Sequence, residues 1–214
     1  MELTVTRGGI KPDSRILDVG CGVGRMALPL TSYLRTGQYD GFDVVARAIR
    51  WCRRNITPRH RNFRFTHISV KNPHYSILGG GASRFAFPYE SSDFDCVVAY
   101  SLFTHLQFEE IRNYLRESYR VLAPGGKFVA TFFLLNDVSV AAQRAVAAFQ
   151  QFPYEQGPVR LASASDAGFA VAIHEPVLLQ LLQETGFRDV AVEPGAWYGL
   201  QNTTTFQDLV VCRK

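Results

Sequence analysis

An acid and three glycines stand together near the start of the chain, and their spacing suits a ligand-binding turn. Asp18 lies in the apolar run 16–19, and Gly20, Gly22 and Gly24 alternate directly after it. Glycines let the backbone turn tightly and approach a ligand closely, and the start of a following helix presents unpaired N–H groups. The stretch therefore predicts a strand, a glycine loop and a helix that together hold a small ligand.

The position of the acid narrows the class of ligand. A dinucleotide fingerprint spaces its glycines as G-x-G-x-x-G, and here Arg25 occupies the place of the last glycine. A carboxylate at Asp18 would repel a pyrophosphate and would suit a ligand with a cationic end. A nicotinamide-dependent oxidoreductase is therefore the weaker alternative, and the acid also argues against a glycine turn that merely joins strand to helix.

Histidines supply the candidates for acid–base chemistry, because their ordinary pKa lies near neutral pH. His105, just beyond an apolar run, is the first candidate base, and capping of the next helix explains it equally well. His174, beside Glu175, is the second, with entry into a helix as its simpler explanation. His74 and Glu175 are weak candidates for contact with an acceptor. Trp197 could stack on a sugar or an aromatic acceptor, and core packing explains it nearly as well.

Asp137 is a further weak candidate, either as a base or as a metal ligand beside a histidine. Close ligand spacing of the H-x-x-x-H kind is missing from the sequence, and such spacing is typical of helical metal sites. The sequence therefore predicts no metal site, and it leaves open whether the reaction needs a metal.

Composition and charge bound the class of protein. The 214 residues are 47% hydrophobic and 20% charged, which predicts one globular domain over residues 1–214. The formal charge is +4, and arginines gather in 47–64. A basic cluster can bind nucleic acid, but no aromatic stacking platform accompanies this one. Because Arg47, Arg50 and Arg54 share a helix face, we interpret it as a solvated surface and expect no nucleic-acid partner.

Cysteine usage and the lack of long apolar runs suggest a compartment. The four cysteines are far apart without a C-x-x-C pair, which is typical of reduced, structural thiols. Residues 1–12 lack the apolar run of a signal peptide, and no stretch is long enough to span a membrane. We therefore expect a cytoplasmic protein without a membrane partner, in an oligomeric state that the sequence does not indicate.

Hydrophobic periodicity predicts strands that alternate with helices after a short, polar start with little room for a covering helix. The expected strands are 16–19, 38–43, 63–66, 94–99, 127–135, 187–192 and 207–212. The expected helices are 24–35, 44–55, 108–122, 138–151 and 174–185. The polar loop 71–84 and the irregular stretch 152–172 are expected as substrate-side loops or a lid. Alternation predicts a parallel sheet with helices on both faces.

Two motifs resemble those of a known family. The pattern D-x-G-x-G-x-G over 18–24 resembles motif I of the class I S-adenosylmethionine-dependent methyltransferases, and 120–127 resembles the turn before their fifth strand. The resemblance covers most of the chain from Arg15 on and includes a bacterial subgroup that acts on small molecules or glycans. It implies an α/β fold, a Rossmann-like doubly wound sheet of seven strands in the order 3-2-1-4-5-7-6 with an antiparallel last strand.

The resemblance also implies S-adenosylmethionine as the cofactor, bound at the carboxyl ends of the strands. Asp43 would accept hydrogen bonds from the ribose hydroxyls, with helix capping as an alternative or additional role. Ser69 stands where the family more often has an acid near the adenine, and Val70 would pack on the ring. Tyr100 and Ser101 would lie beside the methionine part. The full expected set of cofactor contacts is Asp18, Gly20, Cys21, Gly22, Gly24, Asp43, Val44, Ser69, Val70, Tyr100 and Ser101.

The activity that follows from the resemblance is methyl transfer to a small-molecule acceptor. A hydroxyl oxygen, for example of a saccharide or a natural product, is the preferred target, because no N-P-P-Y-type motif of amide methylation is present and histidine bases are. Methyl transfer to nitrogen or carbon, and a catalytically silent cofactor-binding protein, are the alternatives.

Overall fold

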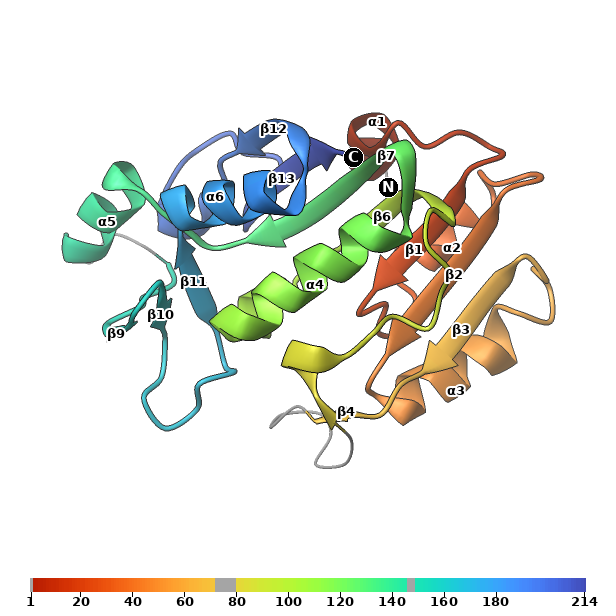
Figure 1. The fold of residues 1–214 in the computed structure, drawn as a ribbon, viewed down its shortest axis with the longest axis horizontal. Coiled ribbons are helices and arrows are strands. Elements are labelled where there is room, and N and C mark those ends of the chain that lie inside the picture. The colour runs from red at the N-terminus through yellow and green to blue at the C-terminus, as the bar shows by residue number, and fades with distance from the viewer. Residues whose placement is uncertain (1, 72–79, 146–148) are drawn as a thin grey trace.

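A sheet of seven strands runs through the molecule, with helices on both faces (Figure 1). The structure, a computed structural model, describes residues 2–71, 80–145 and 149–214. The strands of this main sheet are β1 (Arg15–Val19), β2 (Gln38–Asp43), β3 (Phe63–His67), β6 (Phe94–Ala99), β7 (Leu122–Phe132), β12 (Arg188–Glu193) and β13 (Asp208–Arg213). Across the sheet they follow the order β12-β13-β7-β6-β1-β2-β3.

This order confirms the expected 3-2-1-4-5-7-6 arrangement when the seven strands are numbered along the chain. Neighbours from β3 to β7 pair in parallel, whereas β13 is antiparallel to both β7 and β12. The chain leaves β1 toward β2 on one side and returns to β6 on the other. In an open sheet this reversal opens a crevice at the carboxyl ends of the strands, so a ligand site is expected beyond β1, β2 and β6.

Three helices cover one face of the main sheet, and we call them the α1–α3 layer. They are α1 (Glu2–Gly8), α2 (Ala27–Leu30) and α3 (Ala46–Asn55). Ile49 and Cys52 of α3 pack with Ile16 of β1 and Tyr39 of β2 in one buried cluster. Because side chains alternate along a strand, the neighbours of Ile16 and Tyr39 point to the opposite face.

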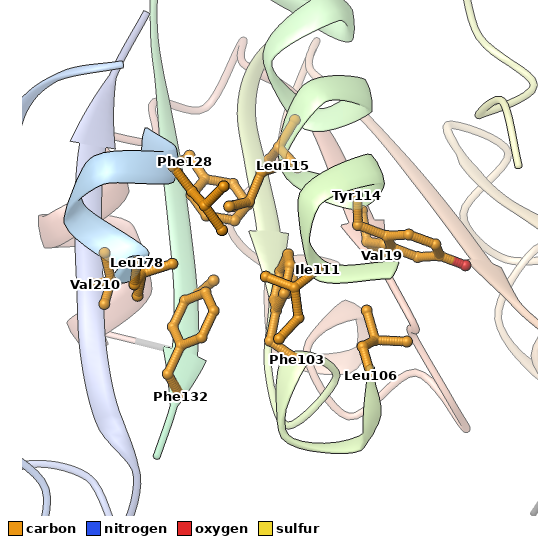
Figure 2. Close-up of a cluster of buried hydrophobic side chains, with 14 of the residues drawn as sticks. Val19, Phe103, Leu106, Ile111, Tyr114, Leu115, Phe128, Phe132, Leu178 and Val210 are labelled. Atoms are coloured by element: carbon orange, nitrogen blue, oxygen red, sulfur yellow. The ribbon is translucent and has the colours of Figure 1, made fainter. Parts of the chain in front are cut away.

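The opposite face carries α4 (Phe108–Val121) and α6 (Glu175–Thr185). Figure 2 shows Ile111 and Leu115 of α4 lying beside Phe128 of β7, with Phe103 below them. The spacing of four residues between Ile111 and Leu115 brings both to one face of the helix. Phe103 begins a short 3-10 helix, η2 (Phe103–His105), so the core also fixes the position of His105.

A second, four-stranded sheet replaces the irregular stretch expected over 152–172. Its strands are β8 (Leu134–Leu135), β9 (Tyr154–Gln156), β10 (Val159–Leu161) and β11 (Val171–His174), in the order β8-β11-β10-β9. Strands of two to four residues are too short to be predicted from hydrophobic periodicity. The expected strand 127–135 is likewise divided, because the Leu134 N–H donates to the Asp208 carboxylate at 2.8 Å and β8 joins the second sheet.

Several helix predictions need correction. Residues 2–8 do form a helix, α1, whose Thr4 hydroxyl lies 2.8 Å from the Tyr100 hydroxyl. The expected helix 24–35 is reduced to the single turn α2, because Gly24 has a positive φ of 76° and Pro29 has no N–H to donate. The helix after the fifth strand, α5 (Asp137–Arg144), ends well before 151.

The remaining short elements are β4 (Val70–Lys71), β5 (Gly80–Gly81), η1 (Ala82–Arg84) and η3 (Ala196–Tyr198). Much of the polar loop expected over 71–84 lies outside the described residues. Within the described part of the chain, none of the helices combines the length and the apolar character needed to cross a bilayer.

Candidate cofactor and active site

A cavity of about 280 Å³ opens at the carboxyl ends of β1, β2 and β6, where the strand order reverses. Its walls come from six separate stretches of the chain. They contain Gly20, Gly22, Arg25, Phe42, Asp43, Val44, Val45, Ile68, Val70, Ala82, Tyr100, Ser101, Leu102, His105, Leu106 and Tyr114. Eight of the residues predicted from the sequence therefore share one cavity, namely Gly20, Gly22, Asp43, Val44, Val70, Tyr100, Ser101 and His105.

The glycine loop follows β1 and lies against the end of β2. The Gly20 and Cys21 N–H groups both donate to the Phe42 carbonyl, at 2.9 and 3.1 Å. Gly20 and Gly22 have φ values of 77° and 53°, in the left-handed region that other residues rarely adopt. A Cβ on Gly22 would meet no atom within 4 Å. The loop therefore leaves its backbone open to a ligand in the cavity.

Asp43 joins the glycine loop to the start of α3. Its Oδ2 accepts from the Gly22 N–H at 2.8 Å, and its Oδ1 accepts from the Val45 N–H at 2.7 Å. The residue is nearly buried, at 9% exposure, yet it lines the cavity. Each carboxylate oxygen has a second lone pair, so Asp43 can accept further hydrogen bonds from ligand hydroxyls while it holds the two N–H groups.

Asp18 lies below the glycine loop and is not part of the cavity wall. It is buried and accepts a hydrogen bond from the Tyr39 hydroxyl. Burial, with a smaller contribution from nearby Asp43, raises the pKa of Asp18 to about 7, although the Tyr39 hydrogen bond works in the opposite direction. At neutral pH this acid is therefore close to half ionised, and any effect on a ligand acts across the loop.

Two other predicted contacts of the loop also pack inward. Cys21 is buried, and burial raises the pKa of its thiol. A Cβ on Gly24 would lie 2.9 Å from the Ile56 side chain and 3.2 Å from the Cys52 sulfur. Gly24 therefore allows α3 to pack closely under the loop, which is a structural role.

The end of the cavity near β3 is apolar. Phe42, Ile68, Val70 and Tyr114 line it. Ser69 is exposed and is absent from the wall, whereas both of its neighbours belong to it. Val70, which was also predicted, lies in the wall and Ser69 does not, because adjacent side chains of an extended segment point in opposite directions.

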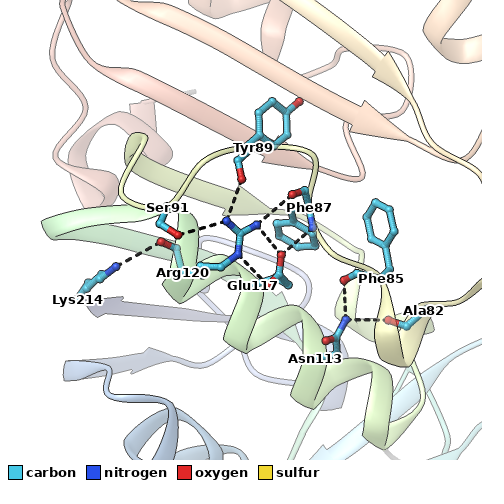
Figure 3. A network of polar contacts seen from close by, with 9 residues as sticks. All are labelled: Ala82, Phe85, Phe87, Tyr89, Ser91, Asn113, Glu117, Arg120 and Lys214. Carbon is cyan, nitrogen blue, oxygen red and sulfur yellow. Dashed lines mark hydrogen bonds and ion pairs between the residues drawn. The ribbon is translucent and has the colours of Figure 1, made fainter.

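A polar clamp on α4 holds the segment that completes this apolar end (Figure 3). The Arg120 guanidinium donates to both Glu117 oxygens, at 2.9 and 2.7 Å, and to the Phe87 carbonyl at 3.0 Å. The Asn113 amide donates to the Ala82 and Phe85 carbonyls, at 2.9 and 2.8 Å. The clamp fixes 82–87 against α4, which places Ala82 in the wall. Sequence analysis missed it, although the three polar residues share one side of the helix.

The end of the cavity near β6 is held by contacts between distant segments. Ser101 has a φ of 53°, an unusual value for a residue with a side chain. Its N–H donates to the Thr131 hydroxyl at 2.8 Å, and its own hydroxyl donates to the Gln207 Oε1 at 3.0 Å. The Thr131 hydroxyl donates to the same Gln207 oxygen at 2.6 Å. These bonds hold Ser101 in its strained conformation at the cavity wall.

His105 is bound to the segment that was expected as a lid. Its Nδ1 lies 2.9 Å from the Gly168 carbonyl oxygen. The Gln107 amide donates to the neighbouring Ala167 carbonyl at 2.5 Å. A carbonyl oxygen only accepts, so Nδ1 carries the hydrogen, and in the neutral ring the lone pair lies on Nε2. The contacts fix both the orientation and the tautomer of a histidine that lines the cavity.

The remaining candidates lie outside the cavity wall. His174 ends β11, and burial and then Arg160 lower its pKa. Glu175 accepts from the Asn136 amide at 2.7 Å, and Asp137 is exposed at the start of α5. None of these three acidic or basic groups lines the cavity.

Trp197 is fully buried and donates its indole N–H to Asp208 at 2.7 Å, so its ring packs in the core and does not face an acceptor. His74 lies outside the described residues. In the ranges that the structure describes, no group of three or more His, Cys, Asp or Glu is arranged to hold a metal ion.

Comparison with known proteins agrees with this architecture. Residues 16–126, just over half of the chain, match the family described as a methyltransferase domain. The sterol 24-C-methyltransferase of Schizosaccharomyces pombe is 33% identical over 132 residues, which is 61% of this chain and 31% of that protein. The 2-phytyl-1,4-naphtoquinone methyltransferase of Synechocystis is 26% identical over 204 residues, 84% of this chain and 79% of that protein.

The chain thus spans about a third of the sterol methyltransferase and most of the naphtoquinone methyltransferase. Among solved structures, the 1,6-didemethyltoxoflavin-N1-methyltransferase of Burkholderia thailandensis, with bound S-adenosylhomocysteine, superposes with a TM-score of 0.62. That likeness covers all of this chain and 75% of that one at 18% identity, so it concerns the fold. With its seven-stranded sheet and its glycine loop at the switch point, this chain belongs to the methyltransferase-domain family.

Proposed function

We propose that this enzyme methylates a small acceptor that carries a hydroxyl group, and that His105 is the general base that removes the hydroxyl proton. The observation that carries the proposal is the hydrogen bond from His105 Nδ1 to the Gly168 carbonyl, at the wall of the cavity. It leaves the basic lone pair of the neutral ring on Nε2. A base fixed in this way needs no rearrangement before it accepts a proton.

The β2 side of the cavity has the chemistry to hold the cofactor. Asp43 offers carboxylate lone pairs to ribose hydroxyls, and the open backbone at Gly22 admits close approach. Val44, Val70 and the apolar residues around them suit a flat ring. S-adenosylmethionine supplies an electrophilic methyl group when bound, so this chain has only to orient the acceptor and to take up its proton.

The β6 side would receive the acceptor. Tyr100, Ser101 and His105 supply polar groups there, and Leu102 and Leu106 supply apolar surface. The turn around Gly168 lies against His105, so the segment 152–172 would frame the entrance. A wall that combines these polar groups with apolar surface fits an acceptor that has an apolar body and a hydroxyl near one end.

Methyl transfer to a ring carbon is a second candidate. The relatives described above act on a sterol and on a naphtoquinone, as their names state. A phenol or hydroquinone that loses a proton shares the resulting charge between its oxygen and ring carbons. The same base at His105 would therefore serve either target atom, and the placement of the acceptor decides between them.

Turnover with a panel of acceptors tests the proposal. We expect formation of S-adenosylhomocysteine and a product one methyl group heavier with phenols or hydroquinones, and much less with amines of similar shape. The proton NMR spectrum distinguishes a methoxy product from a C-methyl product. Efficient turnover of amines in the His105→Gln variant would overturn the role of the histidine and the preference for hydroxyl acceptors.

A further inference from the structure

Charge is divided very unevenly along this chain. Residues 14–89 hold twelve of the 23 Lys and Arg but three of the 19 Asp and Glu, which gives this segment a formal charge of +9 and the rest of the chain −5. The three acids, Asp18, Asp40 and Asp43, are all buried. The segment builds α2 and α3 of the α1–α3 layer. Four of these basic residues, Arg47, Arg50, Arg53 and Arg54, are exposed on α3, so the outer surface of this helix is cationic.

Helix α3 carries the centre of this surface. Arg47, Arg50, Trp51 and Arg54 are all exposed and follow the spacing i, i+3, i+4, i+7, so they form one outward stripe. Trp51 is 43% exposed in the middle of the arginines. The inward face of the same helix, with Ile49 and Cys52, is buried in the core. Only the outward stripe is available to a partner.

The arginines of the stripe do not stabilise helix α3. Arginines three and four positions apart on a helix repel one another by a few tenths of a kcal/mol per pair. In the described part of the chain, no carboxylate forms an ion pair with Arg47, Arg50 or Arg54. Three exposed arginines and one tryptophan, without a carboxylate of the chain to pair with them, suit an external anionic surface better than solvent alone.

Apolar side chains are exposed beside the stripe. Val23, in the glycine loop, and Leu28, in α2, are about half exposed. The loop packs directly on α3, since a Cβ on Gly24 would touch Ile56 and Cys52. The cavity wall includes Val45, which immediately precedes α3. The cationic surface therefore begins at the rim of the cavity and includes exposed apolar groups.

We propose that the outer surface of α2 and α3 docks on a bilayer that contains acidic phospholipids. A bilayer attracts Lys and Arg through its diffuse negative potential and needs no groove. Tryptophan prefers the membrane–water interface, and exposed Val23 and Leu28 would add apolar contact. Single-stranded nucleic acid would call for several stacking aromatics along a channel, whereas this stripe offers one on a convex helix. Docking replaces the expectation of no membrane partner.

The two tryptophans of the chain allow a direct test. Trp197 is fully buried and Trp51 is exposed, so a change in emission on membrane contact reports on Trp51. The protein, with S-adenosylhomocysteine added, is mixed with two kinds of vesicles. One contains phosphatidylcholine alone and the other also contains phosphatidylglycerol, and the lipids of both carry brominated acyl chains. We expect quenching with the acidic vesicles alone, weakened at high salt, and none in the Trp51→Phe variant. Absence of quenching with acidic vesicles at low salt would overturn the proposal.

Charge reversals show whether the α3 stripe is the contact. Arg50→Glu with Arg54→Glu should lower vesicle binding by roughly 20-fold or more, since each basic residue near the surface contributes about a fivefold factor. The matched control is Arg116→Glu with Arg188→Glu, exposed residues of α4 and β12 with the same change in net charge, and it should change binding by less than about threefold. Equal losses in both pairs would overturn the assignment to α3.

Retained affinity for S-adenosylhomocysteine shows that the variants are folded. The test does not depend on the acceptor, so docking and the proposed function succeed or fail separately. The proposal would be overturned in favour of a nucleic-acid surface if the protein binds single-stranded RNA through Arg50 and Arg54 while brominated vesicles do not quench its Trp51 emission.

Discussion

The two sides of the cavity are built in different ways. On the β2 side, Gly20, Gly22 and Asp43 are held by backbone N–H groups within two short, local motifs. On the β6 side, Ser101 and His105 are held by bonds to residues 106 and 63 positions away in the sequence. The β2 side relies on backbone N–H groups, and this arrangement suits a cofactor that is common to many enzymes. The β6 side depends on contacts between distant segments, through the Gln207 side chain for Ser101 and through the Gly168 carbonyl for His105.

The difference assigns a task to each side. The β2 side should control affinity for the cofactor, and the β6 side should control turnover and the choice of acceptor. Variants on one side should leave the property of the other side nearly unchanged. Single substitutions on each side of the cavity test this separation.

Asp43→Ala should lower the affinity for S-adenosylhomocysteine by about 100-fold or more. The substitution removes the proposed acceptor of the two ribose hydroxyls, and each lost hydrogen bond to a charged group costs about 1.5–3 kcal/mol. It also leaves the Gly22 and Val45 N–H groups, which shape this side of the cavity, without their acceptor. Isothermal titration calorimetry measures the change. Asp43→Asn, which keeps the shape and one acceptor oxygen, is the matched control and should lose less. A change below about threefold for Asp43→Ala would contradict the role of the β2 side.

His105→Gln should lower kcat by about 10²-fold or more, because a positioned general base typically contributes 10²–10⁴-fold. The glutamine amide can still donate to the Gly168 carbonyl, so the turn around it should keep its place. Affinity for S-adenosylhomocysteine should stay within about threefold of wild type, since the cofactor side is unchanged. Unchanged kcat with the preferred acceptor would remove His105 from the mechanism.

Asp18→Asn should raise stability at pH 8 by more than about 1 kcal/mol. The pKa of Asp18 is raised from 3.8 to about 7, mainly by burial. The folded protein therefore binds the proton more tightly than the unfolded chain, so the contribution of Asp18 to the free energy of unfolding is fully present below about pH 4 and is lost as the pH rises toward 7. Asparagine removes this dependence, because it does not ionise. Urea unfolding at pH 5 and pH 8 measures the free energy of unfolding of both proteins. An equal change between the two pH values for wild type and Asp18→Asn would contradict the buried ionisation.

The same substitution tests whether Asp18 acts on the ligand across the loop. S-adenosylhomocysteine carries an ammonium group, which favours the ionised acid. Wild-type affinity should therefore rise with pH up to about 7 and then level off, while the Asp18→Asn protein shows no such rise. Parallel curves for the two proteins would limit Asp18 to a structural role.

Gln207→Leu should have the smallest effect, about a three- to tenfold loss in kcat/KM. The Ser101 and Thr131 hydroxyls lose their common acceptor, so Ser101 is held less firmly at the wall. Affinity for S-adenosylhomocysteine should change little. Steady-state kinetics with the preferred acceptor measures the loss, and a fall in cofactor affinity as large as that of Asp43→Ala would contradict the separation of the two sides.

The same contrast explains what could be predicted from the sequence. The strand order and the role expected for Asp43 were implied by the family resemblance, which rests on motifs that are visible in short stretches of sequence. The missed features depend on contacts across the fold. Ser69 lies outside the cavity wall although both of its neighbours line it, and the short strands of the second sheet carry no usable period. The clamp of Asn113, Glu117 and Arg120 needed knowledge of what α4 packs against.

The candidate bases show the limit most clearly. His105 and His174 look alike in the sequence, since each follows an apolar run and precedes a helix. In the structure one lines the cavity and bonds to Gly168, and the other ends β11 outside the cavity wall. The turn that distinguishes them lies 63 residues from His105, so no local pattern could indicate it.

A crystal structure with S-adenosylhomocysteine and a phenolic acceptor tests the central claim most directly. We expect the ribose hydroxyls to lie within hydrogen-bond distance of the Asp43 carboxylate and the acceptor hydroxyl to lie beside His105 Nε2. Ribose bound away from Asp43, or an acceptor hydroxyl held by another group with His105 turned away, would contradict it.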